Sequence, residues 1–111
     1  MAARFELYKD KANEYRFRLK SGNGEIILVS EGYKARASAE NGIESVRKNA
    51  SNEAHFERKE SKNGKFMFNL KATNGQVVGT SEMYDSEAAR DAGIQAVMNA
   101  APDAGLTDQT A

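Results

Sequence analysis

Cysteine is absent from this chain of 111 residues, and histidine and proline occur once each. Without cysteine there is no disulfide, no thiolate nucleophile and no cysteine-ligated zinc. The single histidine, His55, cannot build a usual zinc site alone, and the sequence shows no Ser/His/Asp arrangement. The composition therefore predicts no metal site, no cofactor and no catalytic residues, and we expect the protein not to be an enzyme.

The chain also lacks a net charge and a long apolar run. Its 16 basic residues balance 16 acidic ones, whereas dedicated polyanion binders are usually strongly basic. No stretch approaches the roughly 20 apolar residues that span a bilayer. The first ten residues, MAARFELYKD, lack the apolar segment of a secretory signal. We therefore expect a cytoplasmic protein that does not bind membranes.

What the sequence does contain is a repeat. Residues 3–50 align with residues 54–101 without a gap, and 17 of the 48 aligned positions are identical. The clearest stretch, LKSGNGEIILVSEGY, returns 51 residues later as LKATNGQVVGTSEMY. A gapless match of this length indicates a tandem duplication. We expect residues 1–111 to form one globular domain of two units, ending in a flexible tail over residues 102–111.

Each unit begins with patterns typical of β-strands. After a short alternating stretch, YRFRLK at residues 15–20 alternates strictly between apolar and basic side chains, which predicts a half-buried strand. Asn23-Gly24 follows, and Asn-Gly favours the two positive φ angles of a type I′ hairpin turn. The β-branched segment EIILVS then forms the returning strand. The second unit repeats this pattern around Asn74-Gly75.

The hydrophobic period then changes to that of a helix. One stripe has the spacing i, i+4, i+7 and i+11, and it consists of Ala39, Ile43, Val46 and Ala50. Each unit is thus β-β-β-α, and its 48 residues bury too little apolar surface to be stable alone. We therefore predict a monomeric α+β fold in which two pseudo-two-fold-related units share one antiparallel sheet, with both helices packed on one face.

The two predicted helices differ at their starts and share an internal glycine. In the second unit, Asp85 or Ser86 is the expected N-cap, whereas Ala35 stands at the corresponding place in the first unit. Gly42 and Gly93 lie within the helices, where glycine costs about 1 kcal/mol relative to alanine. Because both units keep this glycine, we predict that the helix backbone packs closely against a neighbouring element.

The motifs of both units resemble those of the YegP-like family. The shared pattern is F-E near the start of each unit, then aromatic-x-F-x-L-K-x-x-N-G, S-E-x-Y and G-I-x-x-V. The resemblance covers residues 3–101 and implies an antiparallel α+β fold in which two β3-α units share a sheet with exchanged terminal strands. It leaves open that Leu106-Thr107 adds to a sheet edge. The family consists of small bacterial proteins of unknown function, so the resemblance implies no activity.

A polar cluster at the join of strand and helix is the first candidate site. It recurs in both units and consists of Ser30, Glu31, Tyr33, Ser81, Glu82 and Tyr84. Two carboxylates related by a two-fold axis are able to form an acid/base or cation site. In the interpretation that we favour, each tyrosine packs under a helix start while serine and glutamate satisfy backbone amides.

A row of basic side chains on one predicted strand is the second candidate. Arg16, Arg18 and Lys20 share the polar face of this strand and are able to contact phosphates. The second unit does not keep the two arginines, so a solvated sheet face is the favoured interpretation. Our main hypothesis is a non-catalytic interaction module that binds a protein or peptide through its exposed sheet face or edge. The alternative is a weak nucleic-acid binder that uses the basic row.

Overall fold

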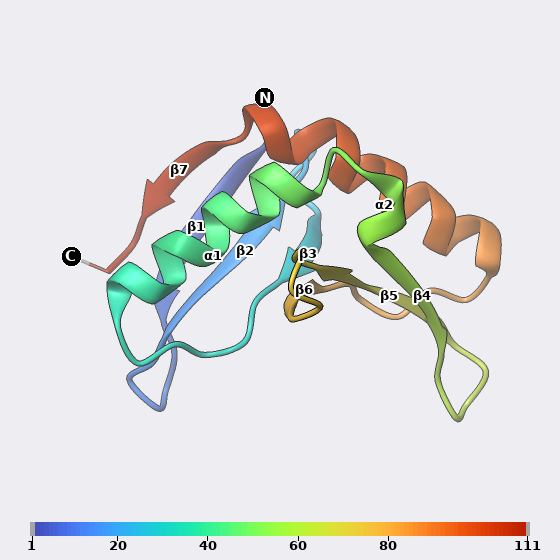
Figure 1. Ribbon diagram of the computed structural model, residues 1–111, viewed down its shortest axis with the longest axis horizontal. Coiled ribbons are helices and arrows are strands. Elements are labelled where there is room, and N and C mark those ends of the chain that lie inside the picture. The colour runs from blue at the N-terminus through green and yellow to red at the C-terminus, as the bar shows by residue number, and fades with distance from the viewer. Residues whose placement is uncertain (1, 111) are drawn as a thin grey trace.

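Residues 2–110 are described by a computed structural model of the chain. Both α-helices lie along one side of a single sheet (Figure 1). The strands are β1 (Arg4–Lys9), β2 (Tyr15–Lys20), β3 (Ile26–Val29), β4 (Phe56–Glu60), β5 (Phe66–Lys71), β6 (Val77–Thr80) and β7 (Gly105–Asp108). The helices are α1 (Arg36–Asn49), α2 (Glu87–Ala100) and two short 3-10 helices, η1 (Glu53–His55) and η2 (Ala101–Asp103). Within residues 2–110, neither α-helix is long and apolar enough to cross a membrane.

In the described part of the chain, seven strands form one sheet in the order β4-β5-β6-β3-β2-β1-β7. Each unit contributes three antiparallel strands, β1 to β3 from the first and β4 to β6 from the second. The two halves meet at a single pair, Val29 of β3 with Thr80 of β6. These residues are 51 positions apart and therefore are counterparts in the repeat, so the pseudo-two-fold axis passes between them. The predicted tandem repeat and shared sheet are confirmed.

The hairpin turns have a geometry different from the predicted one. After β2, the Gly24 N–H donates to the Ser21 carbonyl and the Ser21 N–H donates to the Glu25 carbonyl, both at 2.9 Å. Gly24 has a φ of 87°, whereas Asn23 does not have a positive φ. The loop is therefore a type I turn followed by a glycine bulge. The type I′ prediction was wrong because the loop has three residues, and only the last needs a left-handed backbone. The turn at Gly75 repeats this geometry.

The core lies between the sheet and the two helices. Alternate strand residues on the helix side are fully buried, and they include Phe5, Phe17, Leu19, Phe68 and Leu70. Each α-helix buries one stripe in this core, with Ala39, Ile43 and Val46 from α1 and Ile94 and Val97 from α2. At the helix starts, the Ser86 hydroxyl accepts a hydrogen bond from the Ala89 N–H at 3.1 Å, whereas Ala35 provides no side-chain cap. The predicted difference between the two helix starts is confirmed.

The glycines within the helices lie against aromatic rings. A Cβ atom at Gly42 would approach the Tyr33 hydroxyl and the Phe17 ring to 2.9 Å, and one at Gly93 would approach Tyr84 Cζ to 2.8 Å. Both distances are shorter than real Cβ contacts, so a larger residue would have to displace the ring. The predicted close packing of the helix backbone is confirmed in both units.

The centre of the core breaks the internal symmetry. Leu28 of β3 is fully buried, and its counterpart 51 residues later is Gly79 of β6. A Cβ atom at Gly79 would lie 2.7 Å from Leu28 Cγ. Because each position is next to the residue that pairs across the pseudo-two-fold axis, the space at the axis holds one leucine side chain and not two.

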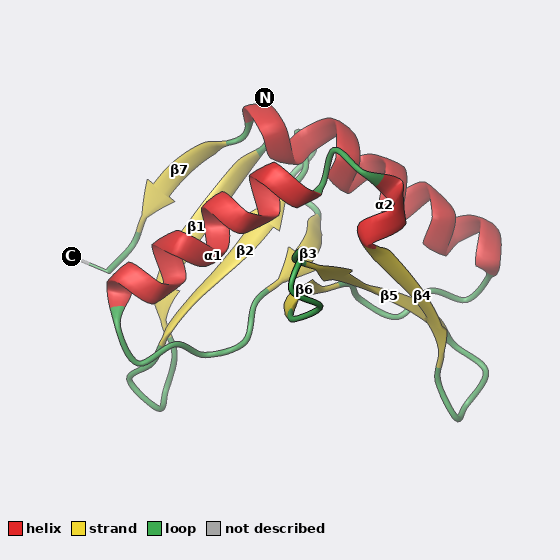
Figure 2. Ribbon diagram, viewed as in Figure 1, coloured by secondary structure: helices red, strands yellow, loops and turns green. Residues whose placement is uncertain are grey.

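The last described segment corrects the expectation of a flexible tail over residues 102–111. Gly105–Asp108 form β7, which pairs in parallel with β1 from the other end of the chain (Figure 2). The Gly105 N–H donates to the Ala3 carbonyl at 3.3 Å, and the Gln109 N–H donates to the Leu7 carbonyl at 2.7 Å. All four residues of β7 are exposed, which explains why the sequence has the polarity of a frayed end. The family resemblance leaves open that Leu106-Thr107 adds to a sheet edge, and β7 is such a strand. Its parallel pairing with β1 departs from a wholly antiparallel sheet.

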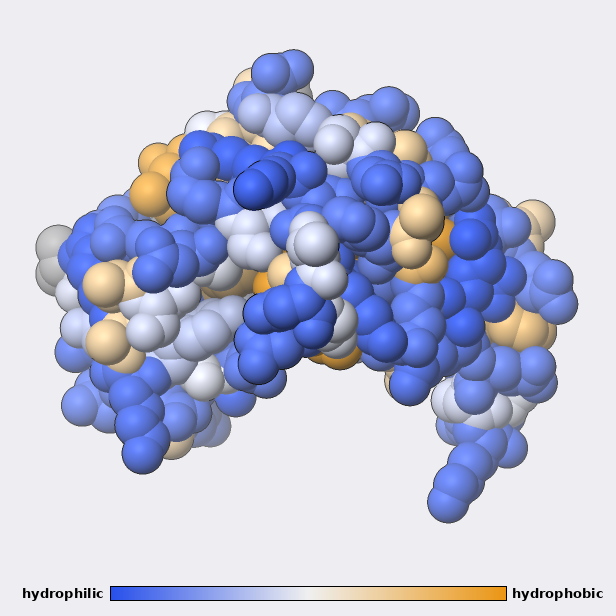
Figure 3. All heavy atoms as spheres, in the orientation of Figure 1, coloured by the Kyte–Doolittle hydropathy of each residue, from blue (hydrophilic) through white to orange (hydrophobic). Residues whose placement is uncertain are grey.

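The surface is mostly hydrophilic, and the molecule is hollowed along the side opposite the helices (Figure 3). Within residues 2–110, the exposed large apolar side chains are Val77, Met83 and Leu106. They come from β6, the connection before α2, and β7. The apolar surface is thus divided among separate segments, whereas protein-binding faces based on hydrophobic burial are contiguous.

Candidate functional site

The predicted basic row on β2 is held by carboxylates on the same face of the sheet. Glu6 of β1 lies opposite Arg18, and its carboxylate is 2.7 Å from Arg18 Nε and 3.3 Å from Lys20 Nζ. A third cation, Arg4, lies 3.2 Å from this carboxylate. The Glu6 side chain is only 4% exposed, although it lies on the face away from the helices, because long basic side chains fold over it.

Effects of opposite sign act on the pKa of Glu6. Burial raises this pKa, whereas hydrogen bonds from Arg18 and Lys20, together with their charges, lower it. The net result is a pKa below the usual 4.5, so the carboxylate is charged at neutral pH. Arg18 and Lys20 therefore point at a buried anion and not at solvent.

Arg16, the remaining member of the basic row, pairs with Asp10 in the turn between β1 and β2. Its Nε lies 2.5 Å from Asp10 Oδ2, and this hydrogen bond is the main reason that the pKa of Asp10 is lowered. Arg16 Nη1 also donates to the Ser30 carbonyl at 3.3 Å. All three side chains of the row thus have acidic partners within the chain.

The second unit keeps the anion but has neither of the two arginines that surround it in the first unit. Glu57, the counterpart of Glu6, lies 3.0 Å from Lys71 Nζ and 3.6 Å from Lys59 Nζ. Asn69 takes the place of the central arginine and donates to Glu57 at 3.4 Å. The Glu57 side chain is 36% exposed, so the strongly buried ion cluster is confined to the first unit.

The Ser-Glu-x-Tyr motif closes a bulge between strand and helix. In the first unit, the Ser30 hydroxyl accepts from the Phe17 N–H at 2.9 Å and donates to the Glu31 carbonyl at 2.8 Å. Tyr33 then forms a bridge with Tyr15. One residue of β2 therefore lies opposite the two residues between Ser30 and Tyr33, which is the definition of a β-bulge.

The second unit repeats the bulge with the same donors and acceptors. Ser81 accepts from the Phe68 N–H at 3.0 Å and donates to the Glu82 carbonyl at 2.8 Å, and Tyr84 bridges to Phe66. Burial, followed by nearby glutamate charge, raises the pKa of Tyr84, as it does for the tyrosine of the first unit. The serine hydroxyls are thus committed to the backbone, and the tyrosines stay protonated at neutral pH.

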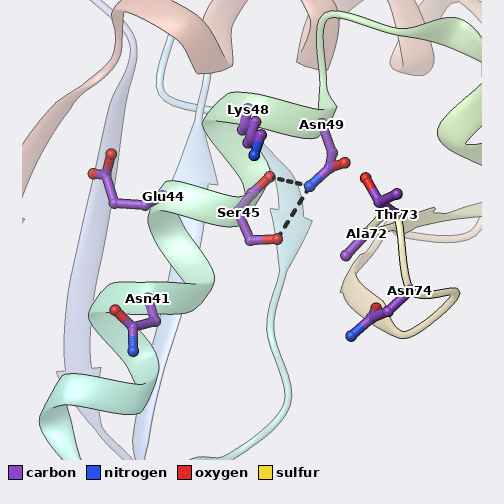
Figure 4. Close-up of a pocket in the computed structure, with 8 residues that line it drawn as sticks. All are labelled: Asn41, Glu44, Ser45, Lys48, Asn49, Ala72, Thr73 and Asn74. Atoms are coloured by element: carbon purple, nitrogen blue, oxygen red, sulfur yellow. Dashed lines mark hydrogen bonds between the residues drawn. The ribbon is translucent and has the colours of Figure 1, made fainter.

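Two hollows flank the turn between β5 and β6. One, of about 390 Å³, lies between this turn and α1 (Figure 4), and its lining is Asn41, Glu44, Ser45, Lys48, Asn49, Ala72, Thr73 and Asn74. Asn49 Nδ2 donates to the Ser45 carbonyl at 2.8 Å and to its hydroxyl at 3.1 Å, so these groups are satisfied within the helix. The other, of about 420 Å³, lies where the start of β4 meets the same turn. Within residues 2–110, no group of three or more His, Asp or Glu side chains is placed to hold a metal ion.

The outer edge of β4 differs from the outer edge of β1, its counterpart. β7 covers β1, whereas β4 is an end strand of the sheet formed by residues 2–110. The cause is the 51-residue period. Residues 54–57 are the counterparts of residues 3–6 in one direction and of residues 105–108 in the other. By analogy with β7, which covers β1, residues 54–57 would be expected to cover β4. They run into β4 itself, however, so they cannot pair along its outer edge, and that edge is open.

The open edge of β4 carries charged side chains. Arg58 lies 3.0 Å from Asp91 of α2 and 3.0 Å from Glu53 of η1, and Lys59 and Glu60 are exposed. Natural sheet edges use such charges to discourage unspecific pairing. The outward-facing backbone groups of β4 remain available for strand pairing. Arg58 is the counterpart of Leu7, and the Leu7 carbonyl accepts a hydrogen bond on the side of β1 that β7 covers.

The family described as "Domain of unknown function (DUF1508)" matches residues 10–57 and again residues 61–108. The chain belongs to the DUF1508 family. The two DUF1508 matches are offset by 51 residues, the period of the repeat. Their last four residues are 54–57 and 105–108, so the family pattern also treats the segment entering β4 as the counterpart of β7.

Relatives in the DUF1508 family extend over nearly the whole chain. A Stutzerimonas stutzeri protein called "UPF0339 protein in ptx operon 5'region" is 59% identical over 108 residues, or 97% of each chain. The UPF0339 protein YegP of Escherichia coli strain K12 is 53% identical over 97 residues, covering 87% of this chain and 88% of that protein.

Two solution NMR structures have the same fold. The structure of E. coli YegP, titled a protein of unknown function, has a TM-score of 0.94 at 48% identity and covers 99% of this chain and 95% of that one. A UPF0339 protein of Shewanella oneidensis has a TM-score of 0.93 at 47% identity, with coverage of 99% and 93%. The predicted YegP-like membership and α+β fold are confirmed, and the names of these relatives state no activity.

Proposed function

We propose that the protein is an interaction module that binds an extended segment of another polypeptide by strand addition to β4. One observation carries the proposal: β7 lies in parallel on β1, while the counterpart edge on β4 is open. The edge strand β1 is thus paired with an added segment, β7, whereas the corresponding edge strand β4 is not. An added segment would gain backbone hydrogen bonds, the usual source of affinity in strand addition.

β7 indicates what such a segment requires. Its four residues are all exposed, so backbone pairing and a few side-chain contacts hold it in place. Arg47 Nη2 donates to the Ala104 carbonyl at 2.7 Å just before the strand, and Arg36 forms an ion pair with Asp108 at its end. A short polar segment is therefore sufficient for this kind of edge. A free segment would bind more weakly than β7, because β7 is tethered to its site.

The nucleic-acid hypothesis has less support. Phosphate binding by Arg18 or Lys20 would have to compete with Glu6, a buried carboxylate that pairs with both. Arg16 is likewise paired with Asp10. A net charge of zero provides little long-range attraction for a polyanion. The sheet edge is therefore the surface that we propose, in place of the basic row.

Solution NMR of the ¹⁵N-labelled full chain tests the proposal. The probes are two eight-residue peptides, DAGLTDQT, which is the sequence of residues 103–110, and DAGLTKQT, its Asp108→Lys form. At least one probe is expected to shift the amide resonances of β4 with a Kd of up to about 1 mM, or roughly −4 kcal/mol. Absence of shifts in β4 for both peptides contradicts the proposal. Shifts confined to β1 and β7 also contradict it, because they indicate exchange with β7.

A pair of variants separates the backbone from the side chain at the same position. Arg58→Pro removes the N–H of the residue that corresponds to Leu7, and proline is tolerated on an edge strand where its nitrogen faces solvent. Arg58→Ala removes the same side chain but keeps the N–H. Strand addition predicts that Arg58→Pro abolishes the β4 shifts and that Arg58→Ala retains them. Equal loss in both variants would indicate a side-chain site and overturn strand addition.

A further inference from the structure

The helices that overlook the two sheet edges differ in charge. We infer that the segment accepted by β4 carries a basic side chain at the position where β7 carries Asp108. This inference rests on the proposed strand addition and adds the chemistry of the partner. The partner class is an extended, basic polypeptide segment that runs parallel to β4.

At the occupied edge, a cation on the helix meets an anion on the added strand. Asp108 lies beside Leu7 in the β7–β1 ladder and forms an ion pair with Arg36, the first residue of α1. Arg36 Nη1 also donates to the Thr110 hydroxyl at 2.9 Å. The start of α1 therefore selects a carboxylate at this position of the strand.

At the open edge, the corresponding helix residue has the opposite charge. The counterpart of Arg36, 51 residues later, is Glu87 at the start of α2. The Glu87 side chain is 71% exposed, and its contact with Arg90 is long, at 4.0 Å. Glu87 is thus free to meet an incoming side chain, and a carboxylate in the place of Asp108 would be repelled where a lysine or arginine would be attracted.

The neighbouring arginine does not reverse this preference. Arg58, the counterpart of Leu7, is already within 3.0 Å of both Asp91 and Glu53. Arg90 is also engaged, at 3.2 Å from Asp91. Three carboxylates therefore face two guanidinium groups on the helix side of this edge, and Glu87 is the least neutralised of the three. The surplus negative charge complements a basic segment.

The test compares DAGLTDQT with DAGLTKQT in the full chain and in its Glu87→Lys variant. NMR shifts of β4 amides give the Kd of each peptide. In the unmodified protein, the lysine peptide is expected to bind roughly three- to tenfold more tightly, the scale of exposed ion pairs when repulsion is replaced by attraction. Glu87→Lys should reverse this order. Higher salt should reduce the difference between the two peptides, because exposed charges are screened.

A matched control changes the same charge elsewhere. Glu31→Lys alters an exposed glutamate of the first unit and should leave the order of the peptides unchanged. Equal Kd values for the two peptides at β4, or an order that survives Glu87→Lys, overturn the inference and leave strand addition standing. If neither peptide shifts the β4 amides, strand addition itself fails and the inference fails with it.

Discussion

Glu6 illustrates how a residue on the uncovered face of a sheet becomes buried. Three basic side chains surround its carboxylate, and its side chain is almost inaccessible to solvent. The sequence contained part of the signal, because alternation along β1 places Glu6 opposite the side of Phe5. It did not contain the register, and only the pairing of Glu6 with Arg18 shows that the basic row is built around an anion.

The ion cluster leads to a pH-dependent prediction. Glu6→Gln should lower the free energy of unfolding at pH 7 by about 1–3 kcal/mol, the scale of hydrogen bonds to charged groups. Because the folded-state pKa of Glu6 is below 4.5, its contribution is fully present above about pH 4.5 and is lost as the pH falls through the folded-state pKa. Urea unfolding of both proteins at pH 7 and at about pH 3 measures this difference. A difference of the same size at both pH values would contradict the assignment.

At the scale of elements, β3 and β6 share a space that holds one large side chain. Leu28 fills it, and Gly79 provides the room. The sequence showed the substitution of glycine for leucine between the two units. It did not show that the two positions meet at the pseudo-two-fold axis, because this depends on how β3 pairs with β6.

A double-mutant cycle tests this shared space. Gly79→Leu should destabilise the fold by about 1–3 kcal/mol through overpacking, and Leu28→Ala should cost about 2–5 kcal/mol through a cavity. The double variant should lose at least about 1 kcal/mol less stability than the two single variants lose together, because the new leucine enters the vacated space. Urea denaturation measures all four stabilities. Additive effects would mean that the two side chains do not compete for one site.

At the scale of the whole molecule, the two units depend on each other. α1 contacts β5 and β6 of the second unit, and α2 contacts β3 of the first. The sheet also continues across the units through Val29 and Thr80. The core is therefore shared, and half of the chain lacks much of the apolar surface against which its own side chains pack.

Division of the chain tests this dependence. A fragment of residues 1–53 should be unfolded or dimeric at micromolar concentration, because only a second copy can replace the missing partner surface. Analytical ultracentrifugation gives its mass, and a dimer should show a thermal midpoint that rises with protein concentration. A monomeric fragment with a cooperative, concentration-independent transition would refute the shared core.

Local pattern by itself determined the duplication, the strands and helices of each unit, the helix glycines and the unequal helix caps. These features are encoded by residues a few positions apart, or by direct comparison of the two copies. Tertiary structure alone decided the register around Glu6 and the open edge of β4. The two edges begin with the same Phe-Glu pair and then diverge, with Leu7 in β1 and Arg58 in β4, but this local difference does not say which segment pairs with either edge. The edges differ in their neighbours because residues 54–57 correspond both to the start of β1 and to β7, but they can occupy only one position, at the start of β4. Only long-range pairing shows which edge strand is left uncovered.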